Sequence, residues 1–159
     1  MSALILLAAL SNPAVANGIE IPRQMSVIEK KMTQVQCAKG ISSRDKSMMQ
    51  VKYARLRSSF NKLWRPLHET YNERVRLPQQ HLEDIRNLER LAAEQKEESQ
   101  SFQLREAELK AEFPERMQAL DRIISNQSAD LEKWAGGPDV AAFINQADRL
   151  LKSSTKMRK

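Results

Sequence analysis

The side chains best suited to metal binding or covalent chemistry are few in this sequence. The chain has two histidines, His68 and His81, and one cysteine, Cys37. A single cysteine excludes an intramolecular disulfide and any zinc site with several cysteines. The two histidines flank the chain reversal predicted below without facing each other, which disfavours a shared metal ion. We interpret the histidines as solvent-facing and Cys37 as a small apolar residue on a helix.

Methionine and glutamate clusters suggest two further metal chemistries. Thioether ligands from Met48 and Met49, with Met25 and Met32, suit copper(I), but their helical spacing is typical of a packed seam. The Glu-rich segments lack the fixed ligand spacing of a calcium loop. The chain also has no Gly-rich phosphate loop, nucleophile elbow or zinc-protease motif. The sequence therefore predicts a non-enzymatic protein with no catalytic residue, cofactor site or metal site.

The N-terminal segment bears on where the protein resides. Its apolar run, residues 4–10, is much shorter than the about 20 residues that a membrane-spanning helix needs. An apolar core followed by Ala14-Val15-Ala16 is typical of a secretory signal, although no Lys or Arg precedes it. Residues 1–16 are therefore predicted to be a signal peptide that directs the protein to a bacterial periplasm or cell envelope. The alternative is a cytoplasmic protein with a short apolar helix, and membrane contact is expected only through residues 4–10.

Charge is distributed unevenly along the chain, whose net charge is +6. Residues 22–80 carry 13 Lys/Arg and 4 Asp/Glu, whereas residues 81–135 carry 8 Lys/Arg and 13 Asp/Glu. Two such halves neutralise each other if they lie side by side. A pI near 9.6 and the basic run from Lys46 to Arg65 suggest a nucleic-acid partner. The expected neutralisation and the scarcity of aromatic residues for base stacking make that partner the weaker alternative.

Apolar residues recur at three- and four-residue steps in two long segments, which is the spacing of a coiled-coil seam. The residues expected to form this interaction surface are Met25, Ile28, Met32, Val35, Leu56, Phe60, Leu63, Leu120, Ile124, Leu131 and Trp134. The sequence thus predicts an all-α fold in which residues 17–135 form a long antiparallel coiled-coil hairpin.

The tip of the hairpin is predicted at Leu77-Pro78, because a proline ring blocks the preceding helical turn. Residue i would then face roughly residue 155 − i, and each arm would be about 55 residues and 80 Å long. In this register Arg57 faces Glu98, and this ion pair helps to set the alignment of the arms.

Three residues are expected to act as hinges: Gly40, Pro78 and Pro114. Gly40 and Pro114 would lie at one level of the hairpin and share a kink. After the second arm, Gly136 and Gly137 can cap a helix end, and Pro138 can begin a new helix. Residues 136–153 are predicted to form a short helix that folds back on the open end of the hairpin, followed by a basic tail, residues 154–159.

These features together favour a helical interaction protein of the periplasm or cell envelope. The layout resembles Skp-type periplasmic holdase chaperones in its helical arms and basic charge, although no family motif is present. The partners expected are unfolded envelope proteins, or subunits of a secretion or conjugation machine in which the chain is a rod-like component; a homo-oligomer is a further option. The alternative from another class is a cytosolic coiled-coil adaptor, similar in layout to the stalk proteins of secretion ATPases.

Overall fold

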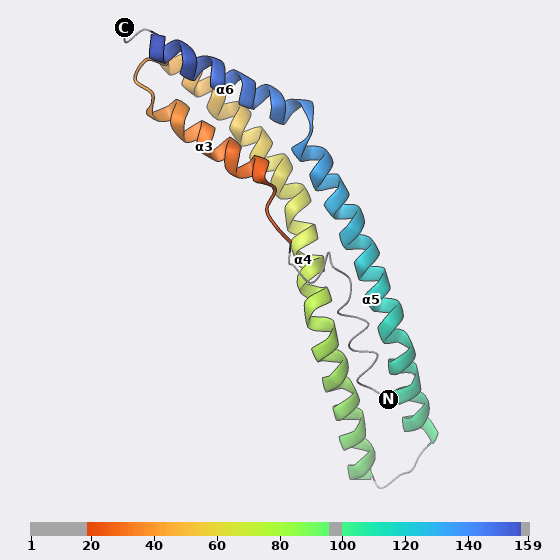
Figure 1. Cartoon of the computed structure of the whole chain (residues 1–159). Helices are drawn as coiled ribbons and strands as arrows, with labels where there is room; N and C mark the ends of the chain where they lie inside the picture. Colours follow the sequence, from red (N-terminus) through yellow and green to blue (C-terminus); the bar gives the residue numbers. More distant parts are fainter. Residues whose placement is uncertain (1–18, 96–99, 157–159) are drawn as a thin grey trace. The chain divides into compact units, whose positions relative to one another are not determined.

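Four helices make up nearly all of the part of the chain that the computed structural model describes, which is residues 19–95 and 100–156. They are α3 (Arg23–Cys37), α4 (Ser43–Gln95), α5 (Gln100–Ala135) and α6 (Pro138–Lys156), labelled as in Figure 1. These residues contain no strand, which confirms the predicted all-α fold. The predicted signal peptide, residues 1–16, lies outside the described residues.

The helices divide into two compact units. The bundle unit consists of Glu20–Pro66 and Gln127–Lys159, so it contains α3, the first part of α4, the end of α5, and α6. The two-helix unit consists of Leu67–Asn126, in which the rest of α4 and most of α5 run antiparallel (Figure 1). The predicted antiparallel helical hairpin is therefore present, and the long helices α4 and α5 each contribute to both units.

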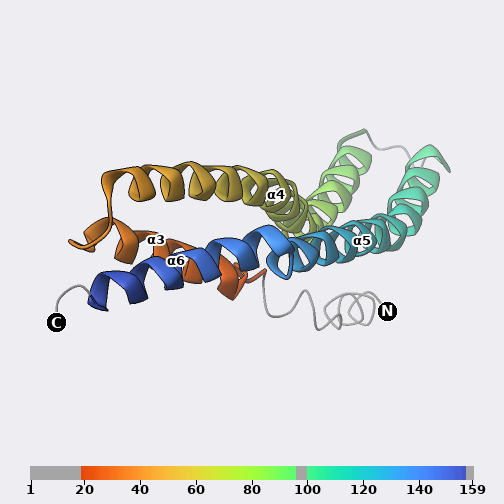
Figure 2. The same cartoon turned by 90° about the horizontal axis from the view of Figure 1, so that it is seen from above.

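The core of the bundle unit lies between α3, α6 and the first part of α4. Helices α3 and α6 pack side by side along this part of α4 (Figures 1 and 2). Their buried residues are Ile28, Met32 and Val35 from α3, Met49 and Leu56 from α4, and Val140, Phe143 and Ala147 from α6, with Ile41 from the connection between α3 and α4. The short C-terminal helix thus folds back as predicted, and it continues to Lys156.

The first predicted arm is not one continuous rod, because the chain reverses between α3 and α4. Gly40 allows this reversal to lie close to α6: a Cβ atom there would be only 3.1 Å from the Cβ of Ser154. Ser42 then begins α4, since its hydroxyl accepts a hydrogen bond from the Asp45 amide at 3.1 Å and donates one to the Asp45 carboxylate at 2.7 Å. As a result, α3 packs against α4 instead of extending it.

The prediction of a tip at Leu77-Pro78 is wrong. Helix α4 continues through Pro66 and Pro78 to Gln95. A proline inside a helix costs about 3 kcal/mol, but Leu77 is buried against α5 in a cluster that spans both helices. This packing compensates for the proline, because helical stability in proteins comes mainly from tertiary contacts. Helix α4 ends at Gln95, and α5, which runs antiparallel to it, begins at Gln100; residues 96–99 lie outside the described part.

The pairing of α4 with α5 follows a single register within both units. Ser59 pairs with Trp134 in the bundle unit, whereas Arg74 pairs with Asp121 and His81 with Phe113 in the two-helix unit. The numbers of paired residues therefore add to 193–195, which replaces the predicted sum of about 155. Residues of α4 therefore face different residues of α5 from those that the sequence predicted.

Candidate functional site

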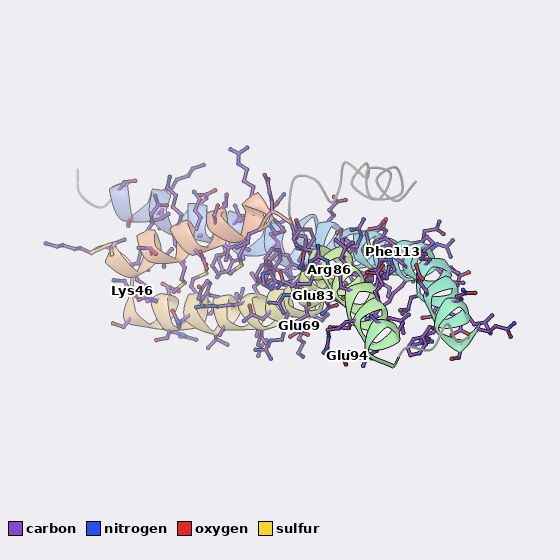
Figure 3. The ribbon with its side chains drawn as sticks, turned by 90° about the horizontal axis from the view of Figure 1, so that it is seen from below. Lys46, Glu69, Glu83, Arg86, Glu94 and Phe113 are labelled. Carbon is purple, nitrogen blue, oxygen red and sulfur yellow. The ribbon has the colours of Figure 1, made fainter. Side chains whose placement is uncertain are left out.

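The inner part of the two-helix unit is a small, well-packed core. Leu77 of α4 and Phe113, Met117 and Leu120 of α5 are all buried and in contact. The ring of His81 stacks on Phe113, with the ring centroids 4.3 Å apart. Phe113 comes from α5, whereas the labelled Glu83, Arg86 and Glu94 come from α4 (Figure 3). This core fixes the register in which the two helices continue outward.

An ion pair that the sequence analysis missed lies beside this core. Arg74 is only 3% exposed, and its Nε donates to Asp121 Oδ1 at 2.7 Å. A guanidinium so deeply buried needs a carboxylate, since an isolated charge is very costly to remove from water. The signal available in the sequence was that Arg74 lies three residues before Leu77 on the seam face. This ion pair therefore links α4 to α5 in addition to the apolar packing between them.

Beyond the stacked His81 and Phe113, the packing between the two helices becomes incomplete. Residues 82–94 of α4 and 100–112 of α5 contain no buried side chain. Apolar residues at helical spacing are nevertheless present and half-buried: Leu82, Ile85, Leu88 and Ala92 on α4, and Phe102 and Leu109 on α5. We call these six residues the outer seam. Leu91 and Leu104, on the same stretches, are 41% and 65% exposed.

The ion pairs that the structure describes around the outer seam form within single helices. Each ion pair described in this stretch lies within one helix: Arg90 with Glu94 at 3.0 Å, Arg105 with Glu108 at 2.9 Å, and Lys110 with Glu106. Exposed pairs at such spacing contribute only a few tenths of a kcal/mol. The outer seam therefore keeps accessible apolar surface that neither side-chain burial nor ion pairing covers.

Charge is separated between the two units, contrary to the expected neutralisation. By sequence, the bundle unit carries 17 Lys/Arg and 7 Asp/Glu, a net charge of +10. Residues 67–126 carry 9 Lys/Arg and 13 Asp/Glu, a net charge of −4. The reason is that α4 ends at Gln95 and α5 begins at Gln100, so that most of the acidic segment lies within the two-helix unit. The first part of α4 instead packs with α3 and α6, which carry net charges of +2 and +1 and therefore add to its positive charge.

An open groove of about 600 Å³ runs along one face of α4 in the bundle unit. Its charged lining residues are Arg57, Lys62 and Arg65, and no acidic residue lines it. Within the described part of the chain, none of these three cations forms an ion pair with a carboxylate. Arg57 instead donates a long hydrogen bond of 3.5 Å to the hydroxyl of Tyr53. The groove thus presents uncompensated positive charge.

Most predicted seam residues are buried: Ile28, Met32, Val35 and Leu56 belong to the core of the bundle unit, and Leu120 belongs to the core of the two-helix unit. The buried members are Met25, Ile28, Met32, Val35, Leu56, Phe60, Leu120, Ile124 and Leu131, whereas Leu63 and Trp134 are half-buried. Ile28, Met32 and Val35 of α3 pack with residues of α4 and α6, whereas Met117 and Leu120 of α5 pack with Leu77 of α4.

Trp134 anchors the end of α5 in the bundle unit. Its indole Nε1 donates to the Ser59 hydroxyl at 2.9 Å, and its ring packs on Phe60 with centroids 5.3 Å apart. Phe60 also stacks on Trp64, at 5.8 Å. Aromatic clusters of this kind combine a large apolar contact with a satisfied polar group. The cluster stabilises the bundle unit and does not form an open binding site.

The predicted register and hinge contacts differ from those observed. Glu98, the expected partner of Arg57, lies outside the described residues. Gly40 belongs to the bundle unit and Pro114 to the two-helix unit. Pro78 lies within α4, and Pro114 lies within α5 and is exposed.

The candidate metal ligands are dispersed. His68 is exposed, with its Nδ1 3.1 Å from the amide nitrogen of Asn72, whereas His81 is half-buried against Phe113 instead of facing solvent. Cys37 is the last residue of α3 and is exposed. Met49 is buried but Met48 is 41% exposed. Within residues 19–95 and 100–156, no three His, Cys, Asp or Glu residues gather as a metal site.

Comparisons with known proteins leave these local features as the basis for any functional argument. Neither a protein-family model nor a curated protein nor a solved structure matches the chain. Among the described helices, none combines the length and apolar character needed to cross a membrane.

Proposed function

We propose that this chain is a non-enzymatic, helical protein-binding protein, and that the outer seam of the two-helix unit contacts its partners. The observation that carries the proposal is the absence of any buried side chain in residues 82–94 and 100–112, although six apolar residues line the seam there. Incompletely covered apolar surface on a helix pair is typical of sites that accept another polypeptide.

The chemistry of the outer seam suits partners of variable sequence. Its leucine, isoleucine, phenylalanine and alanine side chains offer contact without directional hydrogen bonds, and charged residues surround them on both helices. Apolar contact is non-directional, so it discriminates weakly between unfolded segments. A holdase that keeps unfolded envelope proteins soluble is therefore the form of the function that we favour. A rod-like subunit of a secretion or conjugation machine would use the same seam for one fixed partner.

Aggregation assays test the holdase proposal directly. The full chain should suppress the aggregation of a chemically denatured model protein diluted into buffer, as measured by light scattering. The variant Leu88→Ser with Phe102→Ser should lose most of this effect. A matched control, Val75→Ser with Ile123→Ser, removes apolar side chains that are 54% and 44% exposed but lie outside the outer seam, and it should keep the activity. Equal loss in both double variants, or no suppression by the unmodified chain, would contradict a holdase acting through this seam.

The proposed site of action is the periplasm or cell envelope, and it rests on the sequence of residues 1–16. Mass spectrometry of the protein isolated from its native host provides the test. A mature N-terminus at Asn17 supports export, whereas an intact Met1 supports the alternative of a cytosolic coiled-coil adaptor.

A further inference from the structure

The groove on α4 is a basic face with no function in the proposal above. Arg57, Lys62 and Arg65, which we call the basic face, are all exposed and lie on consecutive turns of α4. Eight residues separate Arg57 from Arg65, which corresponds to about 12 Å along a helix. Val51, 53% exposed, lies three turns before Lys62 on the same helix. A ligand of this face would therefore be an elongated, acidic surface with an apolar group near one end.

The two-helix unit presents a surface of that description. Glu108, Glu112 and Glu115, which we call the acid row, lie on one face of α5 and are exposed. Arg105 pairs with Glu108 at 2.9 Å. Neither Glu112 nor Glu115 forms an ion pair in the part of the chain that the structure describes. Leu104, 65% exposed, lies one turn before Glu108 on this face.

The two surfaces are similar in length and opposite in charge. The acid row spans seven residues, or about 10.5 Å along the helix, against about 12 Å for the basic face. If the helices of two molecules run parallel with Val51 beside Leu104, Arg57 falls level with Lys110, between Glu108 and Glu112, and Arg65 falls three residues beyond Glu115. In that alignment, Lys62 falls level with Glu115.

We propose that the basic face binds the acid row of a second copy of this chain. The net charges of the two regions, +10 for the bundle unit and −4 for residues 67–126, favour the same encounter. Each copy carries one basic face and one acid row, so the contact is heterologous and each end of a pair stays available for another copy. The expected product is a concentration-dependent series of oligomers. Exposed charge pairs are screened by salt, so raising the salt concentration should dissociate them.

Charge reversal tests this contact with the full chain. Analytical ultracentrifugation at low salt should show the average mass rising above the 18.2 kDa of one chain as concentration increases. Arg57→Glu, Lys62→Glu and Arg65→Glu together should weaken association at least about tenfold, as should Glu108→Lys, Glu112→Lys and Glu115→Lys together. The chain carrying all six substitutions should associate again, and so should an equimolar mixture of the two triple variants.

A matched control separates the specific contact from net charge. Lys30→Glu, Lys39→Glu and Arg44→Glu change the charge of the bundle unit by the same amount at exposed positions outside the basic face, and this variant should associate like the unmodified chain. Circular dichroism should show equal helicity for every variant. The proposal is overturned if the unmodified chain stays at 18.2 kDa at every concentration, or if neither the six substitutions nor the mixture restores association. An unassociated chain that binds mixed-sequence DNA through Arg57, Lys62 and Arg65 would assign the basic face to nucleic acid instead.

Discussion

Breaking the buried pair between Arg74 and Asp121 should strongly destabilise the two-helix unit. Asp121→Ala leaves a guanidinium that is 3% exposed without the carboxylate to which its Nε donates at 2.7 Å. Removing one partner of a buried ion pair costs about 3–5 kcal/mol. The Asp121 side chain is 23% exposed and Arg74 has further interactions, so we expect the lower end, about 3 kcal/mol. For a chain of this length that corresponds to a fall in Tm of about 6–12 °C.

The measurement is urea and thermal unfolding followed by circular dichroism. Arg116→Ala serves as the matched control, because it removes an α4–α5 pair with Glu73 of 3.0 Å whose side chains are 59% and 47% exposed; its cost should be below about 0.5 kcal/mol. The double variant Arg74→Met with Asp121→Leu should recover most of the lost stability, since apolar side chains replace a buried ion pair at little cost. A cost for Asp121→Ala equal to that of Arg116→Ala would refute the assignment of a buried pair.

Three further predictions test the packing of each unit. Leu77→Ala should lower the free energy of unfolding by about 2–5 kcal/mol, because Leu77 is 4% exposed, whereas Leu91→Ala, at an exposed position, should change it by less than about 0.5 kcal/mol in the same urea titration. Burial lowers the pKa of His81 below its usual 6.5, so the unfolded chain binds more protons below that pH; stability should fall as pH is lowered from about 7.5 to 5.5, and His81→Gln should flatten this dependence. Gly40→Ala places a Cβ atom 3.1 Å from α6 and should lower the Tm, while Gly136→Ala, with 3.7 Å to its nearest neighbour, should leave it nearly unchanged.

The helical class and the residues that bury could be predicted because both follow from local periodicity. Met25, Ile28, Met32 and Val35 occur at three- and four-residue steps, and all four are buried on α3. A three- and four-residue step identifies which face of a helix is apolar. It does not identify the helix against which that face packs, and here Ile28, Met32 and Val35 pack with residues of α6 and α4.

The position of the reversal could not be predicted, because it depends on a balance between local and tertiary terms. The free-energy cost of placing Pro78 within a helix can be estimated from the sequence. The burial of Leu77 against Phe113 and Met117 depends on the register between α4 and α5, which cannot be read from the sequence. The same limit of local sequence patterns applies to Arg74. A cation at a seam position interrupts the apolar pattern, and only the pairing of α4 with α5 shows that Asp121 lies opposite it. Each misassignment therefore arises where a nonlocal contact outweighs a local preference.

The position of the chain reversal differs from the predicted one, and this position also determines which charged residues can pair within one chain. With a tip at Pro78, the acidic segment would lie along the basic one, and Arg57 would have a carboxylate from within its own chain. With the reversal after Gln95, residues near Arg57 pair with the end of α5 and with α6, and the groove beside it keeps its positive charge. Interactions that the fold leaves unmade inside one chain remain available to a partner. The same shift leaves the outer seam without buried side chains at the end of the two-helix unit. The packing of Leu77, in the middle of α4, against α5 is a nonlocal contact, and it leads to both surfaces to which we assign binding.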